Sequence, residues 1–170
     1  MRKLVALLVA VVLGASACSA TPGDSPKQTS KPAAKKQLPD ITLPALGAGP
    51  DIDLGALKGP AVVNIWASWC KPCKRELPIY GAFARKHAGK ISVLGIDYQD
   101  SKKDQALAML RTAKADYPVA YDFDGETRAF GLPKLILLDA AGKTTYAEYV
   151  EIKSLDQLEK IVAENLKAGA

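Results

Sequence analysis

Histidine and cysteine are scarce in this chain of 170 residues, which has one histidine and three cysteines. A pair of cysteines could form half of a structural zinc site, but such sites normally take four ligands, and His87 is the only histidine. His87 also falls near the end of a predicted helix, where a basic side chain suits the helix dipole. No cysteine follows a Pro-x-x-x-Thr-x-x pattern, which argues against a peroxidase. The sequence therefore predicts no bound metal and no other cofactor.

Most of the chain lacks an excess of positive charge. The net charge of the whole sequence is +5, and all of it comes from the N-terminal residues. Six basic residues and one acidic residue precede Leu38, and the rest of the chain holds 17 residues of each sign. A nucleic-acid-binding domain would need a basic face. Nucleic acid is therefore not expected among the partners.

The one long apolar run lies at the N-terminus. Residues 4–13 follow a basic start and precede small residues at 15–17, which together are typical of a secretory signal peptide over 1–17. The run is too short to span a membrane as a helix. The small residues before Cys18 also resemble a bacterial lipoprotein box, in which the cysteine is lipidated. We therefore predict an extracytoplasmic protein held at the cell membrane by lipid on Cys18; ordinary cleavage after residue 17 would give a soluble secreted protein instead.

Residues 18–37 are rich in Ser, Thr, Pro, Lys and Gly and have few apolar side chains. Such a segment cannot bury enough apolar surface to offset its loss of conformational entropy. We predict a disordered, lipid-anchored tether over 18–37. The remaining residues, 38–170, are numerous enough to form one domain with a single core.

Cys70 and Cys73 stand at the start of an amphipathic pattern that follows the apolar run 61–66. A strand that leads into a helix here places both sulfurs in the first helical turn, where unpaired backbone N–H groups and the helix dipole stabilise a thiolate. The thiolate is the form that attacks a disulfide. A purely structural disulfide is the alternative, but its very small loop would constrain the unfolded chain little. The pattern therefore predicts a redox-active dithiol.

The two cysteines are expected to differ in role. Cys70, at the helix start, is expected to be more exposed and to attack, whereas Cys73, one turn further in, resolves the mixed disulfide. Lys71 adds a positive charge beside Cys70, and Pro72 suits an early helical position. Trp69 is expected to shield the dithiol and to offer an apolar surface to a partner.

Strand and helix patterns alternate along the rest of the chain. We predict strands near 52–54 and at 61–66, 91–96, 119–121, 135–138 and 144–150, helices at 70–87, 103–115 and 154–166, and one or two helical turns at 126–130. The segment 97–100 ends the predicted strand and could face the site, but it is interpreted as a solvated loop. Alternating strands and helices that end in a hairpin and a helix indicate an α/β fold with a mixed central sheet.

The segment 64–78, Asn-Ile-Trp-Ala-Ser-Trp-Cys-Lys-Pro-Cys-Lys-Arg-Glu-Leu-Pro, resembles the active-site segment of the TlpA/ResA-like thioredoxin-fold proteins. The resemblance runs from about residue 38 to residue 166. It implies a thioredoxin-like fold, with a mixed central sheet flanked by helices, an N-terminal hairpin and an extra helix. It also implies a membrane-tethered thiol–disulfide oxidoreductase of the bacterial envelope, of a kind that in several members serves cytochrome c maturation.

This resemblance implies further site residues. Glu76, one turn after Cys73, matches a functional glutamate of the family and would handle the Cys73 proton; a surface glutamate in an ion pair is the alternative. The buried aspartate of ordinary thioredoxins is replaced by Asn64, which cannot take a proton. Leu132 and Pro133 match the cis-proline site, whose backbone would bind a substrate chain as a short added strand; a trans turn is the alternative. The segment 129–133, which leads to Pro133, looks shorter than in the family. The shape of the groove that would bind the substrate chain therefore stays open.

The direction of exchange does not follow from these residues. The leading hypothesis is a reductant that draws electrons from a membrane thiol donor and acts on apocytochrome c or another disulfide-bearing envelope protein. An exported oxidant of folding proteins uses the same chemistry in reverse. A peptide-binding or chaperone-like module with an incidental disulfide is the alternative from a different class.

Overall fold

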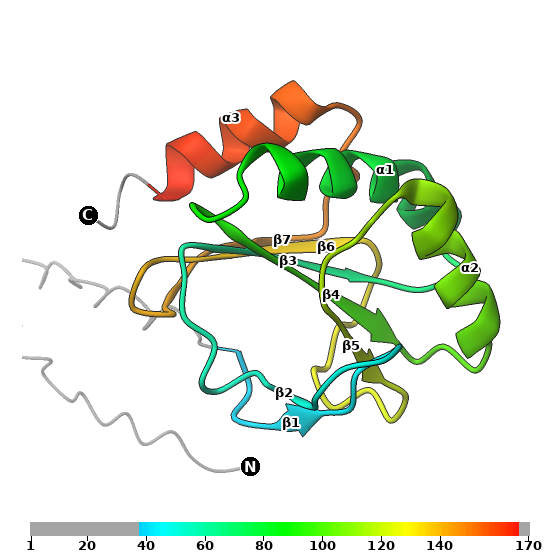
Figure 1. The fold of residues 1–170 in the computed structure, drawn as a ribbon. Coiled ribbons are helices and arrows are strands. Elements are labelled where there is room, and N and C mark those ends of the chain that lie inside the picture. The colour runs from blue at the N-terminus through cyan, green and yellow to red at the C-terminus, as the bar shows by residue number, and fades with distance from the viewer. Residues whose placement is uncertain (1–37, 167–170) are drawn as a thin grey trace, which may run out of the picture. The chain divides into compact units, whose positions relative to one another are not determined.

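The computed structural model of the protein describes residues 38–166 (Figure 1). Within this range the elements are β1 (Thr42–Leu43), β2 (Ile52–Asp53), β3 (Ala61–Trp66), α1 (Lys71–Lys86), β4 (Ser92–Tyr98), α2 (Lys103–Ala113), β5 (Val119–Asp122), β6 (Lys134–Leu138), β7 (Thr144–Glu148) and α3 (Leu155–Leu166). β1 and β2 pair as an antiparallel hairpin, as predicted for the N-terminal part of the domain.

The main sheet has five strands in the order β5-β4-β3-β6-β7. β3 pairs in parallel with β4, and β4 with β5, whereas β6 runs antiparallel to both β3 and β7. This mixed sheet, flanked by helices, confirms the predicted α/β fold class. Because β3 and β4 are parallel neighbours, their carboxyl ends meet at the same edge of the sheet, and the turn that leads into α1 starts there.

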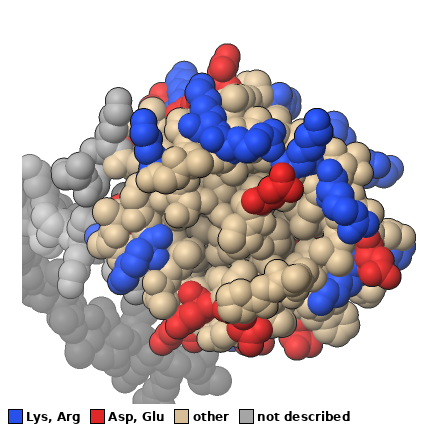
Figure 2. Space-filling model, viewed as in Figure 1, with Lys and Arg blue, Asp and Glu red and all other residues tan. Residues whose placement is uncertain are grey.

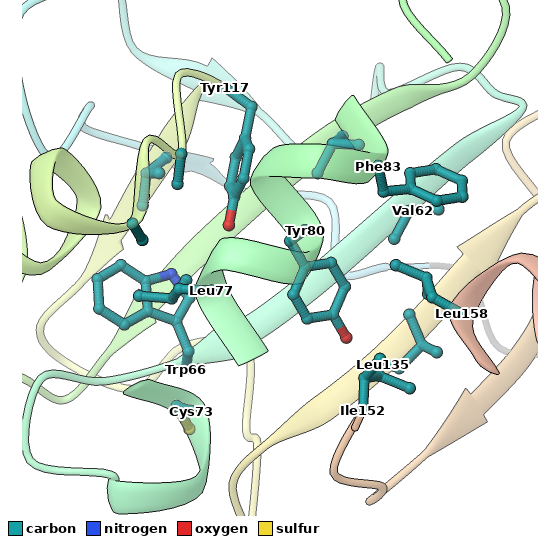
Figure 3. Close-up of a cluster of buried hydrophobic side chains, with 14 of the residues drawn as sticks. Val62, Trp66, Cys73, Leu77, Tyr80, Phe83, Tyr117, Leu135, Ile152 and Leu158 are labelled. Carbon is teal, nitrogen blue, oxygen red and sulfur yellow. The ribbon is translucent and has the colours of Figure 1, made fainter. Parts of the chain in front are cut away.

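The central strand β3 is buried on both faces, which explains its apolar composition. Val62 and Trp66 belong to the core that packs under α1, α2 and α3, and Figure 3 shows Leu77 and Tyr80 of α1 in the same core. The alternate residues of β3 belong to a second core on the other face, which the β1–β2 hairpin covers. Figure 1 shows this division, with the helices on one side of the sheet and the hairpin on the other.

His87 caps the C-terminus of α1, where its backbone N–H donates to the Phe83 carbonyl oxygen over 3.0 Å. Its ring stacks on Phe83 and lies 2.9 Å, from Nε2 to Oε1, from Glu159 of α3. The histidine therefore fastens the end of α1 to α3, which agrees with the structural role expected from its place in the sequence.

The predicted helical turns at 126–130 are wrong. This segment forms turns after β5, and the Asp122 carboxylate accepts hydrogen bonds from the backbone N–H groups of Glu126 (2.7 Å) and Thr127 (3.0 Å). Arg128 adopts a left-handed conformation with φ of 52°. A side-chain acceptor thus replaces the backbone carbonyl that a helix would have used.

Charged residues of both signs surround a centre with few charged side chains on the face shown in Figure 2. Basic side chains lie mainly over the helices, and acidic ones lie mainly along the edge formed by the β1–β2 hairpin. In the part of the chain that the structure describes, no helix has both the length and the apolar character needed to cross a membrane.

Candidate active site

The two cysteines lie at the N-terminus of α1 and are joined in a disulfide. Cys70 is the N-cap residue, and its Sγ accepts a hydrogen bond from the Cys73 backbone N–H over 3.3 Å. Cys70 keeps 5% of its surface exposed and Cys73 none. The helix has no acidic residue in its first turn, while Lys71 is exposed beside the dithiol. In the reduced protein, the positive charge at this helix end favours the thiolate form of Cys70.

Glu76 lies one turn beyond Cys73, and its side chain is fully buried. Its Oε1 accepts a hydrogen bond from Asn64 Nδ2 (3.1 Å), and its Oε2 accepts one from the Ile152 backbone N–H (3.0 Å). Burial raises the pKa of Glu76 to about 7, against the opposing effect of these two hydrogen bonds. The carboxyl group can therefore hold or release a proton near neutral pH.

A surface ion pair is thus excluded for Glu76. The neighbouring Arg75 forms one instead, with Glu151 at 2.7 Å. On an α-helix these adjacent side chains point in different directions, so one faces solvent while the other enters the core.

Asn64 is a functional neighbour whose role the sequence prediction missed. It lies in β3 on the same face as Val62 and Trp66, and it is fully buried. It cannot take a proton, but its amide orients the Glu76 carboxylate. A polar residue at a core-facing position of an otherwise apolar strand was the signal for this contact.

The Leu132–Pro133 peptide bond is cis, as predicted. Pro133 is buried and directly precedes β6, whose first residue, Lys134, pairs with Ile65 near the end of β3. The cis-proline segment and the dithiol turn thus lie at the same edge of the sheet. Leu132 is half-buried and packs against both cores.

Trp69 directly precedes the dithiol and keeps 57% of its surface exposed. Its indole N–H donates to the Gln99 carbonyl oxygen over 3.3 Å. This bond fixes the indole against the segment that follows β4. A large apolar face therefore lies open to a partner next to Cys70.

The solvated loop predicted for 97–100 is wrong at both of its acids, because Asp97 and Asp100 are fully buried. Asp100 accepts hydrogen bonds from the backbone N–H groups of Ser68 (2.5 Å) and Lys102 (2.8 Å). Ser68 belongs to the turn before Cys70, so this segment holds the dithiol turn in place. A pair of acids directly after a buried strand was the available signal.

Two further predictions concern the lipidation site and the binding of a metal ion. Cys18, the expected lipidation site, lies outside the described residues. Within residues 38–166, no group of three or more His, Cys, Asp or Glu side chains is arranged to hold a metal ion.

Comparisons with known proteins show to which family the chain belongs. The family model described as Redoxin matches residues 33–162. The thiol:disulfide interchange protein DsbE of Allochromatium vinosum is 34% identical over 117 residues, which cover 66% of this chain and 61% of that protein. The thiol-disulfide oxidoreductase ResA of Bacillus thuringiensis is 31% identical over 115 residues, covering 64% of this chain and 65% of ResA. The matched part of the chain thus spans less than two thirds of the length of either relative.

A solved structure shares the fold. A secreted disulfide oxidoreductase of Mycobacterium tuberculosis, homologous to E. coli DsbE, superposes with a TM-score of 0.64 at 22% identity, over 74% of this chain and 96% of that one. The solved structure shows a thioredoxin-like fold, the match to ResA confirms the resemblance to the TlpA/ResA-like proteins, and the chain belongs to the redoxin family.

Proposed function

We propose that this protein is an exported thiol–disulfide oxidoreductase that works through Cys70 and Cys73, as a reductant of disulfides in envelope proteins. The observation that carries the proposal is the buried Glu76 carboxyl, which lies one turn from Cys73 and has a pKa raised to about 7 by burial. A structural disulfide needs no group that titrates near neutral pH, whereas thiol exchange must move protons.

The reaction is a pair of exchange steps. The Cys70 thiolate attacks a partner disulfide, so a mixed disulfide forms and one partner sulfur leaves as a thiolate. Cys73 then gives its proton to Glu76 and attacks Cys70, which closes the Cys70–Cys73 bond and releases the second partner sulfur. Two electrons pass to the partner, and the protein ends in the oxidised form that the structure shows.

Partner binding is assigned to the surface around the dithiol. The exposed Trp69 indole offers an apolar contact, and the backbone of Leu132 beside Pro133 offers hydrogen-bonding groups to an extended chain. Lys71 and Pro72 belong to the first turn of α1 and shape the environment of Cys70. Apocytochrome c is the proposed partner class, in keeping with the resemblance to the TlpA/ResA-like proteins, and a membrane thiol protein would supply the electrons.

We expect the redox potential of the Cys70–Cys73 couple to lie near that of thioredoxin, roughly −270 mV, because the protein is proposed to reduce its partners. Equilibration of the purified protein with glutathione or dithiothreitol buffers measures this value. A potential near roughly −120 mV would favour the oxidant instead. Failure to exchange with any disulfide or dithiol would favour the peptide-binding module.

We further propose that residues 1–17 are a signal peptide, that Cys18 carries the lipid and that 18–37 is the tether of the domain. Cys18→Ala is then expected to move the protein from the membrane fraction to the soluble extracytoplasmic fraction, because the lipid supplies the membrane affinity. Fractionation measures the location of the protein, and mass spectrometry of the mature N-terminus measures whether it carries the lipid. In vitro exchange by the variant serves as the control and should be unchanged. Unaltered membrane association would contradict the lipid anchor.

A further inference from the structure

Asp97 is a buried acid that the reaction above does not use. It is the sixth residue of β4 and pairs in register with Trp66, the last residue of β3. Its side chain is fully buried, and neither carboxylate oxygen has a hydrogen-bond donor among the described residues. An ionised carboxylate in this position would be costly, because burial without a donor removes its hydration. The buried Asp97 carboxyl group is therefore expected to carry a proton.

The Asp100 carboxyl lies within hydrogen-bonding reach of Asp97. Two carboxylates cannot bond to each other without a proton, because both are acceptors. Asp100 already accepts two backbone hydrogen bonds, with Oδ2 from Ser68 and with Oδ1 from Lys102. It is therefore the better acceptor of the pair, and Asp97 is the better donor.

Asp100 connects this pair to the dithiol. Ser68 lies two residues before Cys70, and the same turn is closed by the Cys70 N–H, which donates to the Ala67 carbonyl oxygen over 3.1 Å. The Trp69 indole bonds to the backbone of Gln99, next to Asp100. The carboxyl end of β4 thus holds the dithiol turn at two points.

We propose that Asp97 and Asp100 share one proton and that Asp97 thereby acts as a positioning residue for the turn that presents Cys70. Asp97 donates its O–H to Asp100, which fixes the orientation of the Asp100 carboxylate toward Ser68. The inference rests on the proposed function only in its consequence for Cys70; the shared proton itself does not depend on it.

Charged and titratable groups from the neighbouring elements set the ionisation of this pair. Burial raises the pKa of Asp97 to about 8, and the Asp100 charge adds to the rise, while Lys103 at the start of α2 opposes it. Burial also disfavours ionisation of Asp100, but its hydrogen bonds outweigh this effect and lower its pKa. From β5, Tyr121 donates its hydroxyl to the Asp100 carbonyl oxygen, and from α1, Lys74 lines the same groove as Ser68.

The first test follows the proton directly, by nuclear magnetic resonance of the oxidised, full-length, ¹⁵N-labelled protein. The chain has two tryptophans, so the Trp69 indole signal can be assigned against that of Trp66 alone. We expect the Ser68 amide and the Trp69 indole signals to shift together with a midpoint near pH 8, where Asp97 ionises. Asp97→Asn keeps a donor toward Asp100 but cannot titrate, so this shift should disappear.

The second test measures the rate at which iodoacetamide alkylates Cys70 in the reduced protein at neutral pH. Asp97→Ala leaves Asp100 without its donor, and we expect the rate to fall about three- to tenfold because the Asp100 carboxylate that binds Ser68 is no longer fixed in its orientation. Asp97→Asn should restore the wild-type rate. Asp122→Asn is the matched control, since Asp122 is also a buried acid but binds the amides of Glu126 and Thr127 instead.

Three results would overturn the inference: a Ser68 signal that does not titrate between about pH 6 and about pH 9.5, a shift with the same midpoint in Asp97→Asn, or equal slowing of Cys70 by Asp97→Asn and Asp97→Ala. Alkylation reports on Cys70 whether or not the protein reduces a partner. If both tests give the expected results and no partner disulfide is reduced, the proposed function fails and the positioning role stands.

Discussion

Cys70→Ser is expected to abolish disulfide exchange, because it removes the sulfur that attacks the partner. Cys73 cannot take over this role, since its side chain is fully buried behind Cys70 in the first turn of α1. Reduction of insulin by dithiothreitol in the presence of the protein measures the activity. We expect no rate above the uncatalysed background.

Cys73→Ser should have a different effect, which serves as the internal comparison. This variant keeps the attacking Cys70 but lacks the sulfur that resolves the mixed disulfide, so covalent complexes with partners should accumulate. Non-reducing electrophoresis and mass spectrometry detect them. Activity in the double variant, together with no trapped species in Cys73→Ser, would refute the oxidoreductase proposal.

Glu76→Gln is expected to slow the resolving step about tenfold. Acid–base groups commonly contribute ~10²–10⁴-fold, and thiol exchange is intrinsically easier than most reactions that need them. The variant should fold, because rotation of the Asn64 amide lets its Oδ1, which has no donor in the described structure, accept from the introduced NH2 group, and the introduced carbonyl oxygen can still accept from the Ile152 N–H. Rapid-mixing measurements of mixed-disulfide decay against pH report the effect.

The same variant should change how stability depends on pH. The pKa of Glu76 in the folded protein, about 7, lies above its ordinary value of 4.5. The native state therefore keeps a proton that the unfolded state has released, and stability falls as pH rises from about 4.5 to about 7. For the full shift this amounts to on the order of 3 kcal/mol, which Glu76→Gln should remove. Urea unfolding at both ends of this window measures the difference.

Glu164→Gln is the matched control for both measurements. Glu164 is an exposed glutamate of α3 that pairs with Lys160 and does not act on Glu76, so its loss should cost about 0–1 kcal/mol and leave the exchange rate unchanged. Asp97 has a raised pKa as well, so some fall in stability toward pH 8 should remain in Glu76→Gln. Superimposable rate and stability profiles for Glu76→Gln and the wild type would show that Glu76 handles no proton.

The parts of the site that depend on local sequence could be predicted, and those that depend on distant contacts could not. The dithiol at the start of α1 follows from the apolar run before it and the helical pattern after it. The burial of Glu76 depends on Asn64 and on the backbone of Ile152, which is 76 residues away in the chain. Periodicity alone does not report such a partner.

The segment after β4 shows the same limit. Two aspartates close together in a polar stretch favour a solvated loop, and only the pairing of β4 with β3 brings Asp100 to the Ser68 amide. At 126–130 the side chain of Asp122 supplied an acceptor that the helical pattern did not include. In both places a carboxylate bonded to backbone amides decided the local conformation.

The bond between Glu76 and Ile152 has a consequence for the order in which the molecule is assembled. During synthesis the two cysteines leave the ribosome about eighty residues before Ile152. For that interval the nascent chain carries a dithiol without the amide that holds its buried carboxyl in place. The complete proton-handling site forms only when the segment that precedes α3 docks against α1. The dithiol is thus synthesised before the contact that completes the proton-handling site. A chain that ended before Ile152 would have the two cysteines but not the hydrogen bond that Ile152 donates to Glu76.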